Sequence, residues 1–127
     1  MNERQNLGAF GERVAASHLE AAGLTIIGRN VRIARTEVDI VARDRNDTVF
    51  VEVRTRRGAP GLAAESIVPA KLQRIWAFAL AYCEREALEP ESIRLDVVVV
   101  ELDAGGVARN VEHIRGVEVP ELDDSAF

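Results

Sequence analysis

The sequence predicts an α/β fold in which one mixed β-sheet is flanked by helices, in the order α-β-β-β-α-β-β. Segments 4–22 and 69–87 carry apolar residues at the spacing of amphipathic helices. Segments 37–43 and 48–55 alternate apolar with polar residues and are rich in valine and isoleucine, as strands are. The apolar run at 93–102 is typical of a strand buried on both faces.

The first half of the chain is divided by glycine and by a short polar turn. Gly23 is expected to cap the first helix. A strand over 24–34 follows, with a bend near Gly28. The runs 37–43 and 48–55 then predict a β-hairpin.

The second half begins with a segment containing glycine and proline, 56–68, which predicts a mobile loop. Pro69 is expected to begin the second helix, and an edge strand is expected at 110–117. The predicted core face of that helix consists of Leu72, Ile75, Trp76, Ala79, Leu80 and Cys83. A second stripe, which could contact DNA, border the core or form a dimer surface, consists of Lys71, Arg74, Phe78 and Tyr82.

The composition suits one domain with its own core, since the chain has 127 residues of which 47% are hydrophobic. We expect this domain to span 1–117 and the acidic tail, 118–127, to be flexible. No apolar run approaches the roughly 20 residues of a transmembrane helix, and the first residues lack the apolar core of a signal peptide. With a single cysteine, these features predict a soluble, cytoplasmic protein that does not bind membranes.

Charge is distributed unevenly along the chain. The net charge of −5 by itself argues against nucleic-acid binding. Segment 29–57, however, holds eight arginines against five acids, a net charge of +3, whereas segment 84–127 holds four basic and twelve acidic residues, a net charge of −8. This asymmetry permits a phosphate-binding face around the hairpin, although a charged stretch is more often simply solvated surface.

Two acidic residues, Asp39 and Glu52, lie inside the otherwise apolar strands of the hairpin. If the hairpin closes symmetrically around the turn 44–47, residue 39 faces residue 52; a slip of one residue would break this register. Directly opposed residues have Cβ atoms about 5 Å apart. Two carboxylates at so short a distance repel each other. Therefore one of them takes a proton, a cation lies between them, or each pairs with a nearby arginine.

Magnesium fits such a pair, because it prefers oxygen ligands and is often bound by one or two carboxylates together with water and substrate phosphate. A metal ion there could polarise a phosphodiester and generate hydroxide from bound water. On the same register Arg54 would face Glu37, either as a structural ion pair or as a clamp for phosphate.

Several motifs occur in order along residues 5–117: LGAFGERVAASHLEAAGL, IIGRNVR, TEVDIVARD, VFVEVRTR, KLQRIWAFALAY, IRLDVVVV and VEHIR. With these motifs the sequence resembles the YraN-type endonuclease-like family, which looks related to archaeal Holliday-junction resolvases within the restriction-endonuclease-like superfamily. The resemblance implies a restriction-endonuclease-like core and a metal-dependent nuclease acting on DNA, with branched or damaged DNA among the candidate substrates. Related resolvases act as dimers, which implies a homodimer.

The superfamily site combines an acid on a leading helix, an aspartate on one strand and Glu-x-Lys on the next. The resemblance places these roles on Glu12, Asp39 and Glu52, with Asp39 and Glu52 as ligands of Mg²⁺ or Mn²⁺. Taken alone, Glu12 would be an ordinary surface glutamate. The lysine position is occupied by Arg54, which keeps the positive charge but not the compact shape of an ammonium group. Thr36 also replaces the glycine usual in the family.

Contacts with DNA phosphates are expected from six basic residues: Arg29, Arg32, Arg56, Arg57, Lys71 and Arg74. Two other functions stay open. Arg54 could have silenced an inherited site, which would leave a non-catalytic nucleic-acid-binding module, or the chain could be a protein-interaction domain. Asp96 is expected to be a hydrogen-bonded structural acid that could approach the site, and His18, His113 and Cys83 are expected to be structural.

Overall fold

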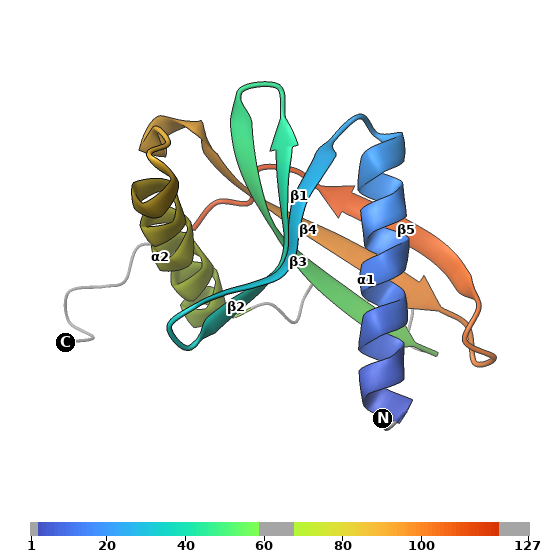
Figure 1. Cartoon of the computed structure of the whole chain (residues 1–127). Helices are drawn as coiled ribbons and strands as arrows, with labels where there is room; N and C mark the ends of the chain where they lie inside the picture. Colours follow the sequence, from blue (N-terminus) through green and yellow to red (C-terminus); the bar gives the residue numbers. More distant parts are fainter. Residues whose placement is uncertain (1–2, 59–67, 120–127) are drawn as a thin grey trace.

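The computed structural model describes residues 3–58 and 68–119, which form a five-stranded sheet in the order β1-β2-β3-β4-β5 with a helix on each face (Figure 1). The predicted α/β class, the order α-β-β-β-α-β-β and the restriction-endonuclease-like core are confirmed. The elements are α1 (Glu3–Ala21), β1 (Thr25–Ile33), β2 (Thr36–Asp44), β3 (Asp47–Arg57), α2 (Pro69–Glu86), the short 3₁₀ helix η2 (Pro90–Ser92), β4 (Ile93–Leu102) and β5 (Ala108–Ile114).

The sheet is mixed because β3 and β4 run parallel while the other neighbouring strands are antiparallel. Parallel neighbours need a long crossover connection, which α2 supplies here. β1 changes register between Ile26 and Gly28, so the predicted bend near Gly28 is a β-bulge. Gly23 lies just after α1 with a φ of +97°, as expected of a helix cap.

Two apolar layers lie on opposite faces of the sheet. Val51 of β3 belongs to the layer under α1, and its neighbour Phe50 belongs to the layer under α2, because successive strand side chains point to opposite faces. β4 is buried on both faces from residue 95 to residue 100, as its apolar run predicted.

The orientation of α2 differs from the prediction. Its buried residues are Leu72, Ile75, Phe78, Ala79 and Cys83. Phe78 packs edge-on against a phenylalanine of β3 with 6.1 Å between ring centroids, and Tyr82 packs there too. Trp76 and Leu80 remain 36% and 41% exposed. Placing Trp76 and Leu80 in the core is therefore wrong. Of the alternatives predicted for the second stripe, the border of the core agrees with the structure, because Tyr82 is half-buried against the core cluster and Phe78 is buried in it.

Some predicted boundaries also shift. β3 continues to Arg57, into the predicted loop 56–68, because its last residues pair with β4. Residues 59–67 of that loop and 120–127 of the predicted tail lie outside the described residues. Within the described ranges, neither helix is long and apolar enough to cross a membrane.

Candidate active site

The sheet forks between β2 and β3. Their backbone pairing runs from the connecting turn to Ile40↔Val51, on the register predicted from the sequence. One step further along, the backbone N–H of Val53 donates to Oδ2 of Asp39 at 2.8 Å. In Figure 1 the β1–β2 hairpin and the end of β3 then diverge toward opposite sides of the view. Groups from both helices can therefore reach one cleft.

The cleft at this fork has a volume of about 450 Å³ and is lined by residues of four elements. It contains all four residues predicted to be catalytic and two of the six predicted to contact phosphate. The lining residues are Leu7, Gly8 and Glu12 of α1, Asp39 of β2, Glu52, Val53, Arg54, Thr55 and Arg56 of β3, and Lys71 of α2.

Glu52 is held by cations on the α2 side of the fork. Its side chain is only 7% exposed, and a carboxylate so enclosed is costly unless it is paired. Nζ of Lys71 lies 2.7 Å from Oε1 of Glu52, and Nη1 of Arg54 lies 3.9 Å from the same oxygen. The nearest partner is therefore the only lysine of the chain, contributed by α2, rather than an arginine of the hairpin.

Of the two roles predicted for Arg54, the ion pair with Glu37 is wrong, and the phosphate clamp stays a prediction. Glu37 instead pairs with Arg32, at 3.2 Å between Nη2 and Oε2. The physical reason is the fork, because the two strands separate before residues 37 and 54 can face each other. Arg54 consequently turns toward Glu52 in the cleft.

Asp39 has a strongly perturbed acidity. Burial and the negative charge of Glu52 raise its pKa from the usual 3.8 to about 7, with a smaller contribution from Glu12. The hydrogen bond from Val53 and the positive charge of Lys71 oppose the rise without cancelling it. Near neutral pH, the protonated and the ionised forms of Asp39 are therefore both populated.

Glu12 enters the cleft because α1 approaches β3 unusually closely. A Cβ atom on Gly11 would overlap the side chain of Thr55, so glycine is required at this contact. Nδ2 of Asn30 donates to Oε2 of Glu12 at 3.1 Å. Asn30 has a left-handed φ of +50°, which asparagine adopts more readily than most residues. Neither Gly11 nor Asn30 was predicted to belong to the site. The only signal in the sequence was that Asn30 is a polar residue inside the predicted strand 24–34.

The four remaining predicted phosphate contacts lie on the surface, outside the lining of the cleft. Arg29 on β1 and Arg74 on α2 are exposed. Arg32 is paired with a hairpin glutamate, as described above. The guanidinium of Arg57 donates to the carbonyl of Ala104 at 3.0 and 2.6 Å.

The carboxylates available to a metal ion are a pair. Among residues 3–58 and 68–119, no three His, Cys, Asp or Glu side chains are grouped so that they could hold a metal ion by themselves. Asp39 and Glu52 thus offer hard oxygen ligands, and further ligands would have to come from water or a bound phosphate.

Asp96 is a structural acid, as predicted, and is separate from the cleft lining. It accepts hydrogen bonds from Nε and Nη2 of Arg94, each at 2.9 Å, and from the backbone N–H of Gly116 at 3.0 Å. Nε2 of His113 lies 2.6 Å from Oδ2. Burial favours a higher pKa for Asp96, but these hydrogen bonds outweigh it and lower the pKa. The predicted structural role of His113 is confirmed by the same contact.

Comparison with known proteins identifies the group to which this chain is related. A family model described as "Uncharacterised protein family UPF0102" matches residues 11–100. The chain belongs to the UPF0102 family. A UPF0102 protein of Frankia alni is 44% identical, over 91% of this chain and 97% of its own. Another, of Beutenbergia cavernae, is 46% identical over 92% and 99%. The YraN-type family membership predicted from the motifs is thus confirmed.

One solved structure, of Pyrococcus furiosus SfsA in complex with Ca²⁺, resembles this UPF0102 protein distantly. The TM-score is 0.40 at 16% sequence identity, and the match covers 91% of this chain and 65% of that one. A likeness at this level carries no argument about the chemistry of the cleft.

Proposed function

We propose that this UPF0102 protein is a Mg²⁺- or Mn²⁺-dependent nuclease that hydrolyses phosphodiester bonds of DNA, with branched or damaged DNA as its substrates. One observation carries the proposal: Glu12, Asp39 and Glu52 reach a single cleft from three different elements, and Lys71 joins them from a fourth. Burial, together with the acids gathered beside it, raises the pKa of Asp39, and such perturbed groups are common at functional sites.

The donor set fits a hard divalent cation. Asp39 and Glu52 would hold the ion, because their repulsion is relieved by positive charge and both offer carboxylate oxygens. When bound, such an ion polarises the phosphodiester and lowers the pKa of a coordinated water. With only two carboxylates as direct ligands, the site would leave positions for water and substrate phosphate, which is how magnesium is commonly held.

The chain itself supplies the positive charge beside these carboxylates. Lys71 presents a compact ammonium group next to Glu52, and Arg54 presents a planar guanidinium to the same oxygen. Both can donate to phosphate oxygens and stabilise the negative charge that grows there during hydrolysis. The lysine that is absent from strand position 54 would thus be replaced in function by Lys71 of α2.

DNA would be held by the arginines around the cleft. Arg56 lines the cleft, and Arg29, Arg32, Arg57 and Arg74 would contact phosphates further along the duplex. Because such contacts release counterions, binding should weaken as salt rises, with a slope set by the number of phosphates neutralised.

A second candidate is a DNA-binding module without catalysis. The pairing of Glu52 with Lys71 and Arg54 favours it, because the buried carboxylate is already compensated without any metal ion. This candidate predicts salt-sensitive DNA binding that is indifferent to Mg²⁺ and Mn²⁺.

The deciding experiment is a cleavage assay on duplex, single-stranded, flapped and four-way-junction DNA with Mg²⁺, Mn²⁺ or EDTA. We expect metal-dependent cleavage that Asp39→Asn and Glu52→Gln each reduce at least about 100-fold. Glu37→Gln is the matched control, since Glu37 lies on the same hairpin but pairs with Arg32 outside the cleft. DNA binding without cleavage under every condition would leave the binding module as the function.

A further inference from the structure

Lys71 already supplies positive charge to both carboxylates of the cleft that are proposed to hold a metal ion. Its Nζ lies 2.7 Å from Oε1 of Glu52, and Nη1 of Arg54 lies 3.9 Å from the same oxygen. The charge of Lys71 also acts on Asp39, whose pKa it lowers against the effects of burial and of the neighbouring acids. The ammonium group therefore relieves the repulsion within this pair in the way that a bound cation would.

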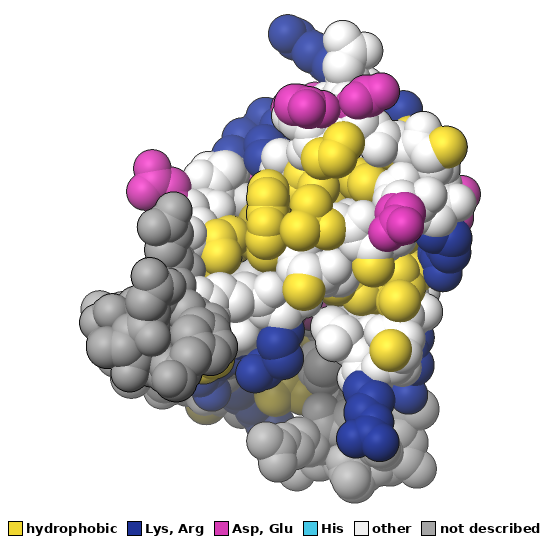
Figure 2. All heavy atoms as spheres, turned by 90° about the vertical axis from the view of Figure 1, so that its left-hand side faces the viewer, with side chains coloured by type: hydrophobic (Ala, Val, Ile, Leu, Met, Phe, Trp, Pro, Cys, Tyr) yellow, Lys and Arg dark blue, Asp and Glu magenta, His cyan; other side chains and the backbone are white. Residues whose placement is uncertain are grey.

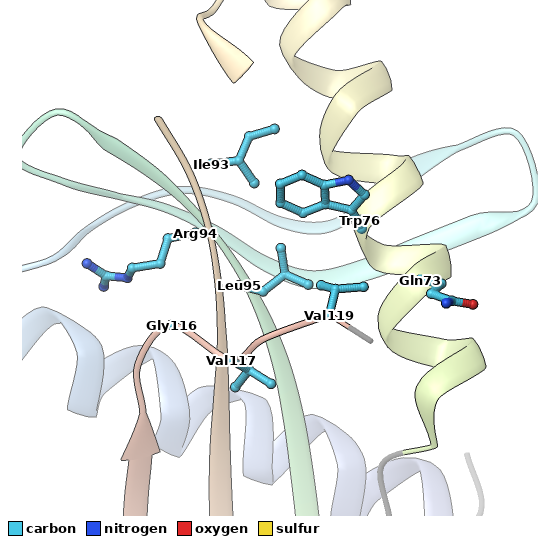
Figure 3. Close-up of a pocket in the computed structure, with 8 residues that line it drawn as sticks. All are labelled: Gln73, Trp76, Ile93, Arg94, Leu95, Gly116, Val117 and Val119. Atoms are coloured by element: carbon cyan, nitrogen blue, oxygen red, sulfur yellow. The ribbon is translucent and has the colours of Figure 1, made fainter. Parts of the chain in front are cut away.

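The packing of α2 directs Lys71 to the cleft but leaves its side chain accessible. In Figure 3, Gln73 and Trp76 project from α2 beside a separate groove of about 600 Å³. Both lie at least about 140° around the helix from Lys71, which lines the cleft instead. The side chain of Lys71 is 37% exposed, whereas that of Glu52 is 7% exposed. The lysine can therefore leave the ion pair for another partner, while the carboxylate stays enclosed.

The helix dipole does not favour a cation at the position of Lys71. The N-terminal end of a helix carries partial positive charge and favours acidic residues. The first turn of α2 nevertheless contains Lys71 and no acid. Figure 2 shows basic side chains in the lower part of the side that carries α2, and the N-terminal end of α2 points downward in Figure 1. Lys71 is therefore held at the cleft by Glu52 and not by the helix.

We propose that Lys71 is an exchangeable cation, which neutralises Glu52 until a DNA phosphate and a divalent metal ion enter the cleft together. This inference rests on the proposed function and concerns the regulation of that same site. An ammonium group 2.7 Å from Oε1 of Glu52 would strongly repel a metal ion bound to the same oxygen, so Lys71 has to leave. A DNA phosphate offers the released ammonium group a new anionic partner. Each ligand thus lowers the cost of binding the other, and this coupling is reciprocal.

Calorimetric titration of Mn²⁺ into the full chain without DNA tests the exchange. Lys71→Met removes the ammonium group and should tighten Mn²⁺ binding at least about tenfold, because Glu52 is left without its nearest partner and no ion pair has to break. Lys71→Arg keeps the positive charge and should change the affinity by less than about threefold. The matched control is Arg85→Met, which also removes an ion-paired cation from α2. Its partner is Glu86, outside the cleft, so the Mn²⁺ affinity should stay unchanged.

Fluorescence anisotropy of labelled four-way-junction DNA measures the same coupling from the other side. Mn²⁺ in place of EDTA should tighten DNA binding by the wild type at least about tenfold. This ratio should fall about tenfold in Lys71→Met, because the exchange of Lys71 is the step that links the two ligands. A gel after each titration verifies that the DNA is intact, and circular dichroism verifies that the variants fold.

The outcomes separate this inference from the proposed function. Equal Mn²⁺ affinities of the wild type and Lys71→Met would overturn the exchange and leave the proposed nuclease standing. Wild-type DNA binding that Mn²⁺ does not change would also overturn the exchange, and this measurement needs no variant should Lys71→Met fail to fold. Failure of both the wild type and Lys71→Met to bind Mn²⁺, with or without DNA, would overturn the metal-dependent nuclease as well.

Discussion

Replacing Asp39 by asparagine should make the protein more stable at pH 8. The ionised carboxylate lies partly buried beside Glu52, and this environment raises its pKa from 3.8 to about 7. At about 1.4 kcal/mol for each tenfold change in proton affinity, the rise corresponds to about 4 kcal/mol of unfavourable ionisation in the folded state. Because Asp39 is partly accessible to solvent, we expect roughly 2 kcal/mol of that to appear as stability. Asparagine keeps an oxygen that can accept the Val53 N–H.

The sign of the pH dependence follows from the raised pKa. Protonation of Asp39 favours the folded state, and this contribution is complete below about pH 4 and lost as the pH rises through 7. The free energy of unfolding of Asp39→Asn, measured by urea denaturation, should thus match that of the wild type near pH 4. It should exceed the wild-type value increasingly up to about pH 8. A variant that is less stable than the wild type at pH 8, or a difference independent of pH, would refute this reasoning.

Three further predictions concern Gly11 and Asn30 near the cleft and Asp96 in β4. Gly11→Ala should lower the free energy of unfolding, measured by urea denaturation, by about 1–3 kcal/mol, because the new methyl group overlaps the side chain of Thr55 in β3. Gly8→Ala is the control and should be neutral or stabilising, because its new methyl group meets nothing within 4 Å. Asp96→Asn should destabilise by about 3–5 kcal/mol at pH 7, with the loss shrinking in acid because the pKa of this carboxyl is lowered. Asn30→Gly, which keeps the left-handed backbone but removes the donor, should lower the DNA cleavage rate by releasing Glu12, with little change in melting temperature.

The fold was predictable because its periodicities were clear. The buried strand β4 was expected at 93–102 and lies at Ile93–Leu102, since a continuous apolar run has few alternatives in an α/β chain. α2 was harder, because apolar residues surround most of its circumference and periodicity alone cannot decide which arc is buried. The sheet settles the matter by packing Phe78 against β3, which leaves Trp76 exposed.

The site was predictable only where local register determines it. Asp39 and Glu52 belong to one hairpin, so strand alternation sufficed to bring them together. Contacts between distant elements were not accessible to such reasoning. The pairing of Lys71 with Glu52 depends on how α2 crosses the sheet, and the close approach at Gly11 depends on how α1 packs on β3.

Manganese binding tests the central claim most directly. Crystals of the full chain grown or soaked with Mn²⁺ should show an anomalous difference peak within about 2.0–2.3 Å of carboxylate oxygens from both Asp39 and Glu52. The ammonium group of Lys71 should move away from its position 2.7 Å from Glu52. The same crystals of Asp39→Asn should lack the peak. The absence of an anomalous peak between Asp39 and Glu52 at millimolar Mn²⁺, with Lys71 still paired to Glu52, would contradict the metal-dependent account.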